Sequence, residues 1–321
     1  MDWEAVQQSI QGPASLVMAP FNDDLSLNLG ALENNLRYIV DGGLRKGSGF
    51  LIVPCGTGEY LALEPDEHRQ MVETAIKVTD GVLPVVAGVA SCNWKDAIRL
   101  AENARRAGAQ CVMIPPPYYY RLDDDALVEW FRVIAEAVDI GILVYDQVWR
   151  VGLGTSVSLA AMERLAQIPN VVGLKYGSPA QYMDMIDALD RFADRFAFID
   201  NSLGYVSTVG FMHGASGFIS GPSSWWPTFE LHYWDLLKEG KYAEADRWHA
   251  RLSPYMEFHR DEEFGGESYF YAAALLKACL EHVGLYGGPV RPPFRALTQR
   301  QKDMVFAVLQ QIGAPSHAAV R

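Results

Sequence analysis

Short hydrophobic runs alternate with longer amphipathic segments along the first two thirds of the chain. Each run is rich in Val and Ile, which favours buried β-strands, whereas the segments between them show the spacing of apolar positions that is typical of helices. Eight such runs lie at residues 14–20, 49–55, 83–89, 111–117, 141–146, 171–176, 196–200 and 214–220. Strands that alternate with helices favour a parallel sheet, and eight of them favour a closed α/β barrel of the (β/α)8 or TIM type.

The strand-like runs stop after residue 223, and the remaining chain has a helical pattern. Residues 225–260, 268–284 and 298–313 read as helices, and a turn-rich segment covers residues 284–294. We therefore expect a barrel with the active site over residues 1–223 and a C-terminal helical subdomain over residues 224–321. The alternative is an open doubly wound sheet, but no G-x-G-x-x-G motif follows the first strand.

The composition narrows the class of protein. The chain has 321 residues, of which 50% are hydrophobic, so a large core can form without a metal or disulfide. A net charge of −12 and a pI of about 5.0 argue against general electrostatic binding of nucleic acid. We see no signal peptide and no apolar run that could span a bilayer. The expectation is a cytoplasmic protein with no nucleic-acid or membrane partner.

The spacing of the four cysteines does not predict a metal site. They are not arranged as C-x-x-C pairs, and their spacing matches no zinc module. We expect free thiols in a reducing compartment.

The stretch NVVGLKYGS, residues 170–178, places a lysine at the end of a buried strand. Strict alternation puts Lys175 on one face with Gly173 and Val171, and Val172 and Leu174 on the other. Burial inside a barrel would lower the pKa of this ammonium group, and a neutral amine can form a Schiff base with a ketone. The alternative is a lysine that reaches solvent or pairs with a carboxylate.

Two other strand ends carry candidate groups. Tyr145 ends the fifth strand, where its phenol could relay a proton, although a core tyrosine with a satisfied hydroxyl is the simpler interpretation. In CGTGEY, residues 55–60, Gly56 and Gly58 would let backbone N–H groups and the Thr57 hydroxyl converge on an anion. The alternative is a tight β–α turn. We expect Glu59 to order this loop rather than to do chemistry.

In their order and spacing these motifs resemble the dihydrodipicolinate synthase and N-acetylneuraminate lyase superfamily of Schiff-base aldolases and dehydratases. The resemblance runs over essentially the whole chain and includes MAPF, GTGEYLALEPDEH, PPYYYR, VYDQVWRVG, NVVGLKYGS and GASGFIS. It implies that Lys175 forms the imine with a 2-oxo acid, that Tyr145 relays protons, and that Thr57 and neighbouring amides hold the substrate carboxylate.

The resemblance implies further features. Tyr119, in the loop after the fourth strand, falls where the family often sends a catalytic tyrosine across a subunit interface. Arg150 falls where the synthases bind a substrate carboxylate, and the backbone carbonyl of Ile219 falls beside the imine pocket. A homotetramer built from dimers is expected. No metal or cofactor is expected, because the amine of the protein is itself the electron sink.

Departures from the synthase pattern favour one branch of the superfamily. Gly56 stands where the synthases carry a first hydroxyl residue, and Asp146, Trp149 and Tyr176 also depart from the synthase pattern. The GTGEY loop and the late GGPVRPPF segment resemble the 5-dehydro-4-deoxyglucarate dehydratases. We therefore expect a dehydratase of a sugar-derived 2-oxo-3-deoxy or 5-dehydro-4-deoxy acid. The alternatives are a pyruvate-dependent aldolase or synthase, which Arg150 favours, and a non-catalytic barrel that binds a small acid.

Overall fold

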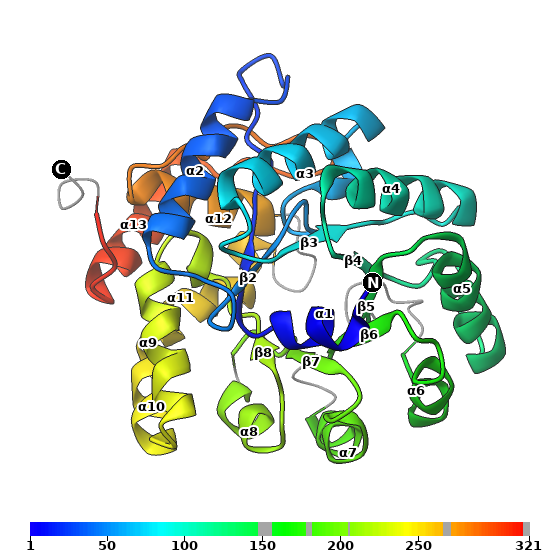
Figure 1. Ribbon diagram of the computed structural model, residues 1–321. Helices are drawn as coiled ribbons and strands as arrows, with labels where there is room; N and C mark the ends of the chain where they lie inside the picture. Colours follow the sequence, from blue (N-terminus) through cyan, green and yellow to red (C-terminus); the bar gives the residue numbers. More distant parts are fainter. Residues whose placement is uncertain (147–155, 178–181, 205, 266–270, 317–321) are drawn as a thin grey trace.

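A closed barrel of eight parallel strands forms the centre of the computed structural model, which describes residues 1–146, 156–177, 182–204, 206–265 and 271–316 (Figure 1). Each strand pairs with the next in sequence, and β8 pairs with β1. The strands are β1 (Gly12–Leu16), β2 (Phe50–Ile52), β3 (Val85–Gly88), β4 (Cys111–Ile114), β5 (Gly141–Tyr145), β6 (Val171–Tyr176), β7 (Ala197–Asp200) and β8 (Gly217–Phe218). The predicted (β/α)8 fold is confirmed.

Helices surround the barrel between successive strands. They are α2 (Leu29–Asp41), α3 (Pro65–Thr79), α4 (Trp94–Ala107), α5 (Asp124–Ala137), α6 (Leu159–Leu165), α7 (Tyr182–Phe192) and α8 (Ser207–Met212). The local sequence explains their ends. Helix α3 begins with Pro65 in its first turn and a capping box between Glu64 and Glu67, and α4 ends at Gly108, whose φ of 104° needs glycine.

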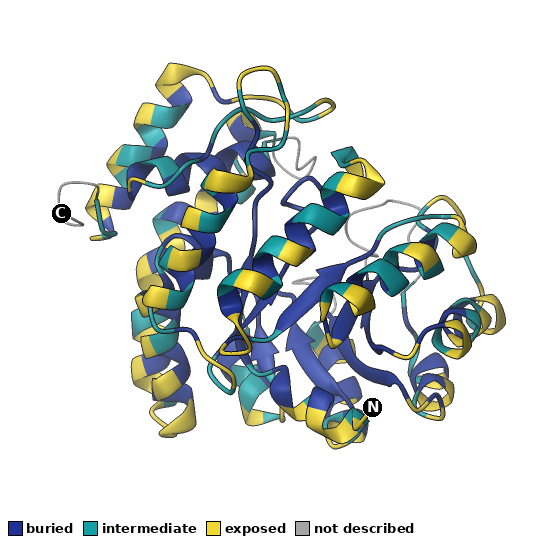
Figure 2. Ribbon diagram, turned by 45° about the horizontal axis from the view of Figure 1, so that its top comes forward, coloured by how far each residue is buried: buried dark blue, intermediate teal, exposed yellow. Residues whose placement is uncertain are grey.

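The strands are buried, whereas the outer helices carry both buried and exposed residues (Figure 2). Two layers of hydrophobic core follow from the alternation of side chains along the strands. One cluster fills the barrel interior and includes Phe50, Val86 and Leu143. Val6 and Ile10 join it from α1 (Trp3–Ser9) and the residue that follows this helix, which closes the amino-terminal end of the barrel. The other clusters lie between the strands and the outer helices.

Strand β6 departs from strict alternation. Its register with β5 shifts so that Ile142 pairs with Val171 and Leu143 pairs with Gly173, which leaves Val172 as an extra residue. Val172 therefore packs with the interior cluster and Val171 with the outer one, opposite to the predicted faces. A Cβ on Gly173 would lie 2.8 Å from the Leu143 side chain, so this glycine admits close strand packing rather than clearing space for Lys175.

The C-terminal part consists of α9 (Pro227–Lys238), α10 (Tyr242–His249), α11 (Ser253–Met256), α12 (Ala272–His282) and α13 (Gln299–Gln311). The predicted helical segment 225–260 is thus divided, and Gly240, at φ 71°, separates α9 from α10. Side chains of α11, α12 and α13 belong to the same hydrophobic cluster as the barrel interior. The division into two units at residues 223 and 224 stays a prediction.

Candidate active site

Lys175 and Tyr145 lie side by side at the carboxyl ends of β6 and β5. Their Cα atoms are paired in the sheet, and the Lys175 Nζ atom lies 3.7 Å from the centroid of the Tyr145 ring. Both side chains are buried, with 6% and 2% of their surface exposed. The amine therefore lies against the phenol ring in a position shielded from water, at the end of the barrel where active sites of this fold occur.

A cavity opens above these strand ends, and the C-terminal helices form its roof. It brings together three predicted site residues, Lys175, Thr57 and Ile219. Residues that the sequence analysis did not single out complete the lining: Leu16, Asn201, Leu203, Ser220, Gly221, Tyr255, His259, Ala272 and Leu276. The cavity thus combines an amine, a hydroxyl and an amide with an apolar wall.

The loop after β2 is a tight turn in which glycine is required. A Cβ on Gly58 would lie 2.2 Å from the Val17 carbonyl oxygen, and the Gly58 N–H donates to the Cys55 sulfur at 3.1 Å. A Cβ on Gly56 would lie 3.5 Å from the ring of Tyr60, so this ring occupies the space beside the missing side chain. Of the three residues predicted to bind an anion, Thr57 lines the cavity, and the Gly58 amide is engaged by sulfur.

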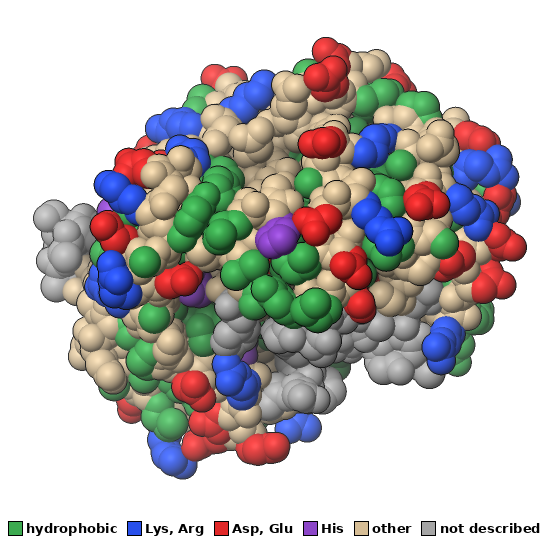
Figure 3. Space-filling model, turned by 90° about the horizontal axis from the view of Figure 1, so that it is seen from below, with side chains coloured by type: hydrophobic (Ala, Val, Ile, Leu, Met, Phe, Trp, Pro, Cys, Tyr) green, Lys and Arg blue, Asp and Glu red, His purple; other side chains and the backbone are tan. Residues whose placement is uncertain are grey.

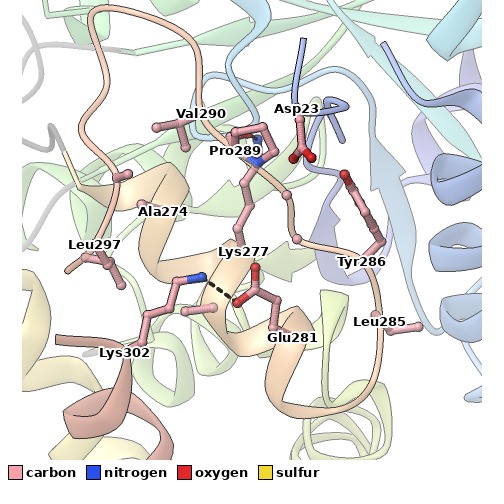
Figure 4. A pocket seen from close by; sticks show the side chains of 14 residues that line it. Asp23, Ala274, Lys277, Glu281, Leu285, Tyr286, Pro289, Val290, Leu297 and Lys302 are labelled. Carbon is pink, nitrogen blue, oxygen red and sulfur yellow. Dashed lines mark hydrogen bonds and ion pairs between the residues drawn. The ribbon is translucent and has the colours of Figure 1, made fainter. Parts of the chain in front are cut away.

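Glu59 anchors this loop to the C-terminal part of the chain. Its carboxylate is fully buried, lies 2.6 Å from the Lys277 Nζ atom and accepts the backbone N–H of Arg291 at 2.8 Å. Lys277 also donates to the Pro289 carbonyl at 2.6 Å (Figure 4). Burial raises the pKa of Glu59 and lowers the pKa of Lys277, because desolvation outweighs their mutual attraction. The predicted ordering role of Glu59 fits this arrangement.

A second buried carboxylate lies behind the cavity. Ser220 donates to Glu230 of α9, and the Ser223 N–H donates to the same carboxylate at 2.9 Å. Burial raises the pKa of Glu230 to about 8. Glu230 is therefore a protonated acid through much of the neutral range.

Other predicted residues lie outside the cavity or outside the described chain. Tyr119 is 73% exposed on the loop after β4, in edge-to-face contact with Tyr120, so its role across a subunit interface stays a prediction. Arg150 and Trp149 lie outside the described residues. Tyr176 packs on the outer side of the sheet against Phe198 and does not share the face of Lys175.

Several cavity residues were missed by the sequence analysis for different reasons. Asn201 directly follows the seventh predicted strand, so the rule that strand ends face the active site could have found it. Tyr255, His259 and Leu276 come from the C-terminal helices. No motif marks these residues, because only the packing of the helices over the barrel brings them to the cavity.

The described part of the chain holds no helix long and apolar enough to cross a membrane. Within the same ranges, no three or more His, Cys, Asp and Glu side chains are grouped to hold a metal ion. On the face shown in Figure 3, basic and acidic side chains are interspersed. This face therefore presents no continuous basic surface of the kind that binds nucleic acid.

Comparisons with known proteins cover nearly the whole chain. A sequence model of the dihydrodipicolinate synthetase family matches residues 9–312. The 4-hydroxy-tetrahydrodipicolinate synthase of Methanoculleus marisnigri is 30% identical over 94% of this chain and 99% of the relative. The corresponding synthase of Methanosphaerula palustris is 32% identical over 93% of this chain and 98% of the relative. The crystal structure of dihydrodipicolinate synthase from Aquifex aeolicus has a TM-score of 0.84 at 22% identity, over 96% and 99% of the two chains.

Proposed function

The chain belongs to the dihydrodipicolinate synthetase family of class I Schiff-base lyases, and we propose that it joins pyruvate to an aldehyde through an imine on Lys175. The observation that carries this proposal is the buried amine of Lys175 against the ring of Tyr145, in one cavity with Thr57. Such an arrangement provides a nucleophile, a proton donor and a hydroxyl for the substrate carboxylate.

The reaction uses only groups of the chain and its two substrates. The Lys175 amine attacks the ketone carbon of pyruvate, and loss of water forms the imine. Removal of a proton from the methyl carbon gives an enamine, which attacks the aldehyde carbon and forms the new C–C bond. Water then releases the 4-hydroxy-2-oxo acid and restores the amine. Tyr145 is the proposed proton relay, and Thr57 is the proposed carboxylate ligand.

The dehydratase expected from the GTGEY and GGPVRPPF segments has weaker support. The curated relatives that cover most of the chain are named 4-hydroxy-tetrahydrodipicolinate synthase, which favours the alternative of a pyruvate-dependent synthase. The missing hydroxyl at position 56 was the argument against a synthase. The ring of Tyr60 borders that space, so a phenol from the same loop lies near the position of the absent group.

Borohydride trapping tests the proposal. With pyruvate, we expect a reduced adduct that peptide mapping places on Lys175, and no adduct in Lys175→Ala. Replacement of the exposed Lys46 by Ala is the matched control and should leave trapping unchanged. An adduct with longer sugar-derived 2-oxo acids and none with pyruvate would favour the dehydratase hypothesis instead. No adduct with either class would overturn the Schiff-base mechanism for this chain.

A further inference from the structure

Asn201 lies at the carboxyl end of β7, directly beside the lysine strand. In the pairing of β6 with β7, Lys175 lies opposite Ile199, and the Asn201 N–H donates to the Tyr176 carbonyl at 3.0 Å. Asn201 is two residues beyond Ile199, or about 6.6 Å farther toward the mouth of the barrel. It therefore stands above the level of the lysine, where the part of a substrate beyond the imine carbon would extend.

The Asn201 side chain belongs on the inner side of the barrel. Ile199 packs in the interior cluster, whereas the Asp200 carboxylate accepts hydrogen bonds from Ser202 and from Ser207 of α8. Alternation then returns Asn201 to the inner side. In agreement with this, Asn201 lines the cavity that also contains Lys175.

The Asn201 amide nitrogen is buried without a partner. The residue is 1% exposed, and its Nδ2 atom makes no hydrogen bond with any of the described residues. Folded proteins seldom leave a buried N–H group unpaired, because the group loses its hydrogen bonds to water on burial. A donor of this kind in a substrate cavity indicates an acceptor on the ligand.

The surroundings of Asn201 select the kind of acceptor. The amide is neutral, and both apolar side chains, such as Leu203 and Leu276, and polar ones, such as Tyr255 and His259, line the same cavity. Because Thr57 is the proposed ligand of the carboxylate, the amide of Asn201 is available for an uncharged carbonyl or hydroxyl oxygen. A neutral oxygen of the second substrate is therefore the acceptor that fits this amide.

We propose that Asn201 is a specificity-determining residue whose Nδ2–H donates to the aldehyde oxygen of the second substrate. This inference rests on the proposed function. When the enamine carbon attacks the aldehyde, the electron pair of the C=O π bond moves to oxygen, which takes up a proton and becomes the C4 hydroxyl of the product. A preorganised N–H at that position stabilises the developing negative charge. The same contact recognises the C4 hydroxyl in the reverse reaction.

A pair of probes isolates this contact when trapping is measured from the mass of the intact five-carbon adduct, because cleavage of the hydroxy acid would leave a lighter pyruvate adduct. Concentrations for half-maximal borohydride trapping are compared for 4-hydroxy-2-oxopentanoate and 2-oxopentanoate, which differ only in the C4 oxygen. In the wild-type chain we expect the hydroxy acid to be trapped at a concentration about 10- to 100-fold lower, the usual scale for a buried hydrogen bond to substrate. Asn201→Ala should reduce this preference to less than about 3-fold. Asn201→Asp, which keeps the size but removes the donor, should do the same.

The outcomes separate this inference from the proposed function. Pyruvate has no C4 atom, so its half-trapping concentration is the reference for correct folding of each variant. An equal preference for the hydroxy acid in wild type and Asn201→Ala, or no preference in the wild type, would overturn the role of Asn201. A purely structural role would raise the concentrations for pyruvate and both probes by the same factor. Failure of the wild-type chain to trap pyruvate would instead count against the proposed function.

Discussion

The buried ion pair between Glu59 and Lys277 allows a quantitative test of how the C-terminal helices support the active-site loop. Lys277→Met removes the ammonium group. The fully buried Glu59 carboxylate then keeps the backbone N–H of Arg291, at 2.8 Å, as a hydrogen-bond donor. A carboxylate without its cation takes up a proton rather than remain charged in the interior. The cost of that protonation sets an upper limit to the destabilisation.

The limit follows from the ordinary pKa of the glutamate, 4.5. Protonation at pH 7 costs roughly 3.4 kcal/mol, because the pH lies about 2.5 units above that pKa and each unit corresponds to about 1.36 kcal/mol. We expect Lys277→Met to lower the free energy of unfolding at pH 7 by about 3 kcal/mol, within the usual cost of breaking a buried pair. At about 2–4 °C per kcal/mol, the scale for the largest domains surveyed, the melting temperature should fall by roughly 6–12 °C.

The pKa of Glu59 determines how the loss of stability in Lys277→Met changes with pH. In the variant the folded-state pKa of Glu59 lies above its unfolded value, so the stability from its bound proton is present at low pH and lost as the pH rises. The deficit relative to wild type should therefore shrink as the pH falls from 7 to 5, by at most about 1.4 kcal/mol for each pH unit, because burial raises the pKa of Glu59 in the wild type as well.

The control is Lys302→Met, which removes the partly exposed pair with Glu281 at 2.8 Å (Figure 4) and should cost less than about 1 kcal/mol. Thermal unfolding of both variants between pH 5 and pH 8 decides the question. If both variants lost the same free energy of unfolding at every pH, the reasoning would be refuted.

Three further predictions concern the site and its surroundings. Tyr145→Phe should slow turnover of pyruvate and aldehyde by about 10²- to 10⁴-fold, the scale of a lost proton-transfer group, and a rate within 2-fold of wild type would make the tyrosine structural. Gly58→Ala should raise the pyruvate concentration for half-maximal trapping by roughly 10-fold or more, because the new Cβ would meet the Val17 carbonyl oxygen at 2.2 Å. The helical Gly30→Ala, whose nearest neighbour would lie at 3.7 Å, is the control, and equal effects would contradict the role of the loop. Glu230→Gln should stabilise the fold by up to about 3 kcal/mol at pH 7 and by little at pH 5. Here burial raises the folded-state pKa from 4.5 to about 8, so the wild type loses stability as the pH rises between these values, whereas glutamine stays neutral. If the free energies of unfolding of the two proteins changed with pH in parallel, this would count against a raised pKa of Glu230.

The strands and the pairing of Lys175 with Tyr145 were predictable because each depends on local sequence. Strands of a closed parallel barrel are buried on both faces, so they appear as continuous apolar runs, and all eight were found. A lysine and a tyrosine at the ends of neighbouring strands must then lie close together, as Lys175 and Tyr145 do. The bulge at Val172 could not be predicted, because a change of register depends on the partner strand rather than on the sequence of β6 alone.

Contacts between distant parts of the chain were the main feature that the sequence did not reveal. Glu59 was expected to order its loop, but no pattern indicates that its partner is Lys277. Tyr255 and His259 likewise reach the cavity only because short helices pack over the barrel mouth. Sequence reasoning therefore located Lys175 better than the C-terminal residues that line the same cavity.

Helix α12 contacts both the cavity and the loop after β2. Leu276 forms part of the cavity roof, and the next residue, Lys277, holds Glu59 and thereby the loop that contains Thr57. A displacement of α12 that widened the cavity at Leu276 would also pull Lys277 away from Glu59. The Glu59 carboxylate would then lie in the protein interior without its cation. The ion pair therefore opposes widening of the roof. We infer that the room for the second substrate and the position of the carboxylate ligand are determined together by this one helix.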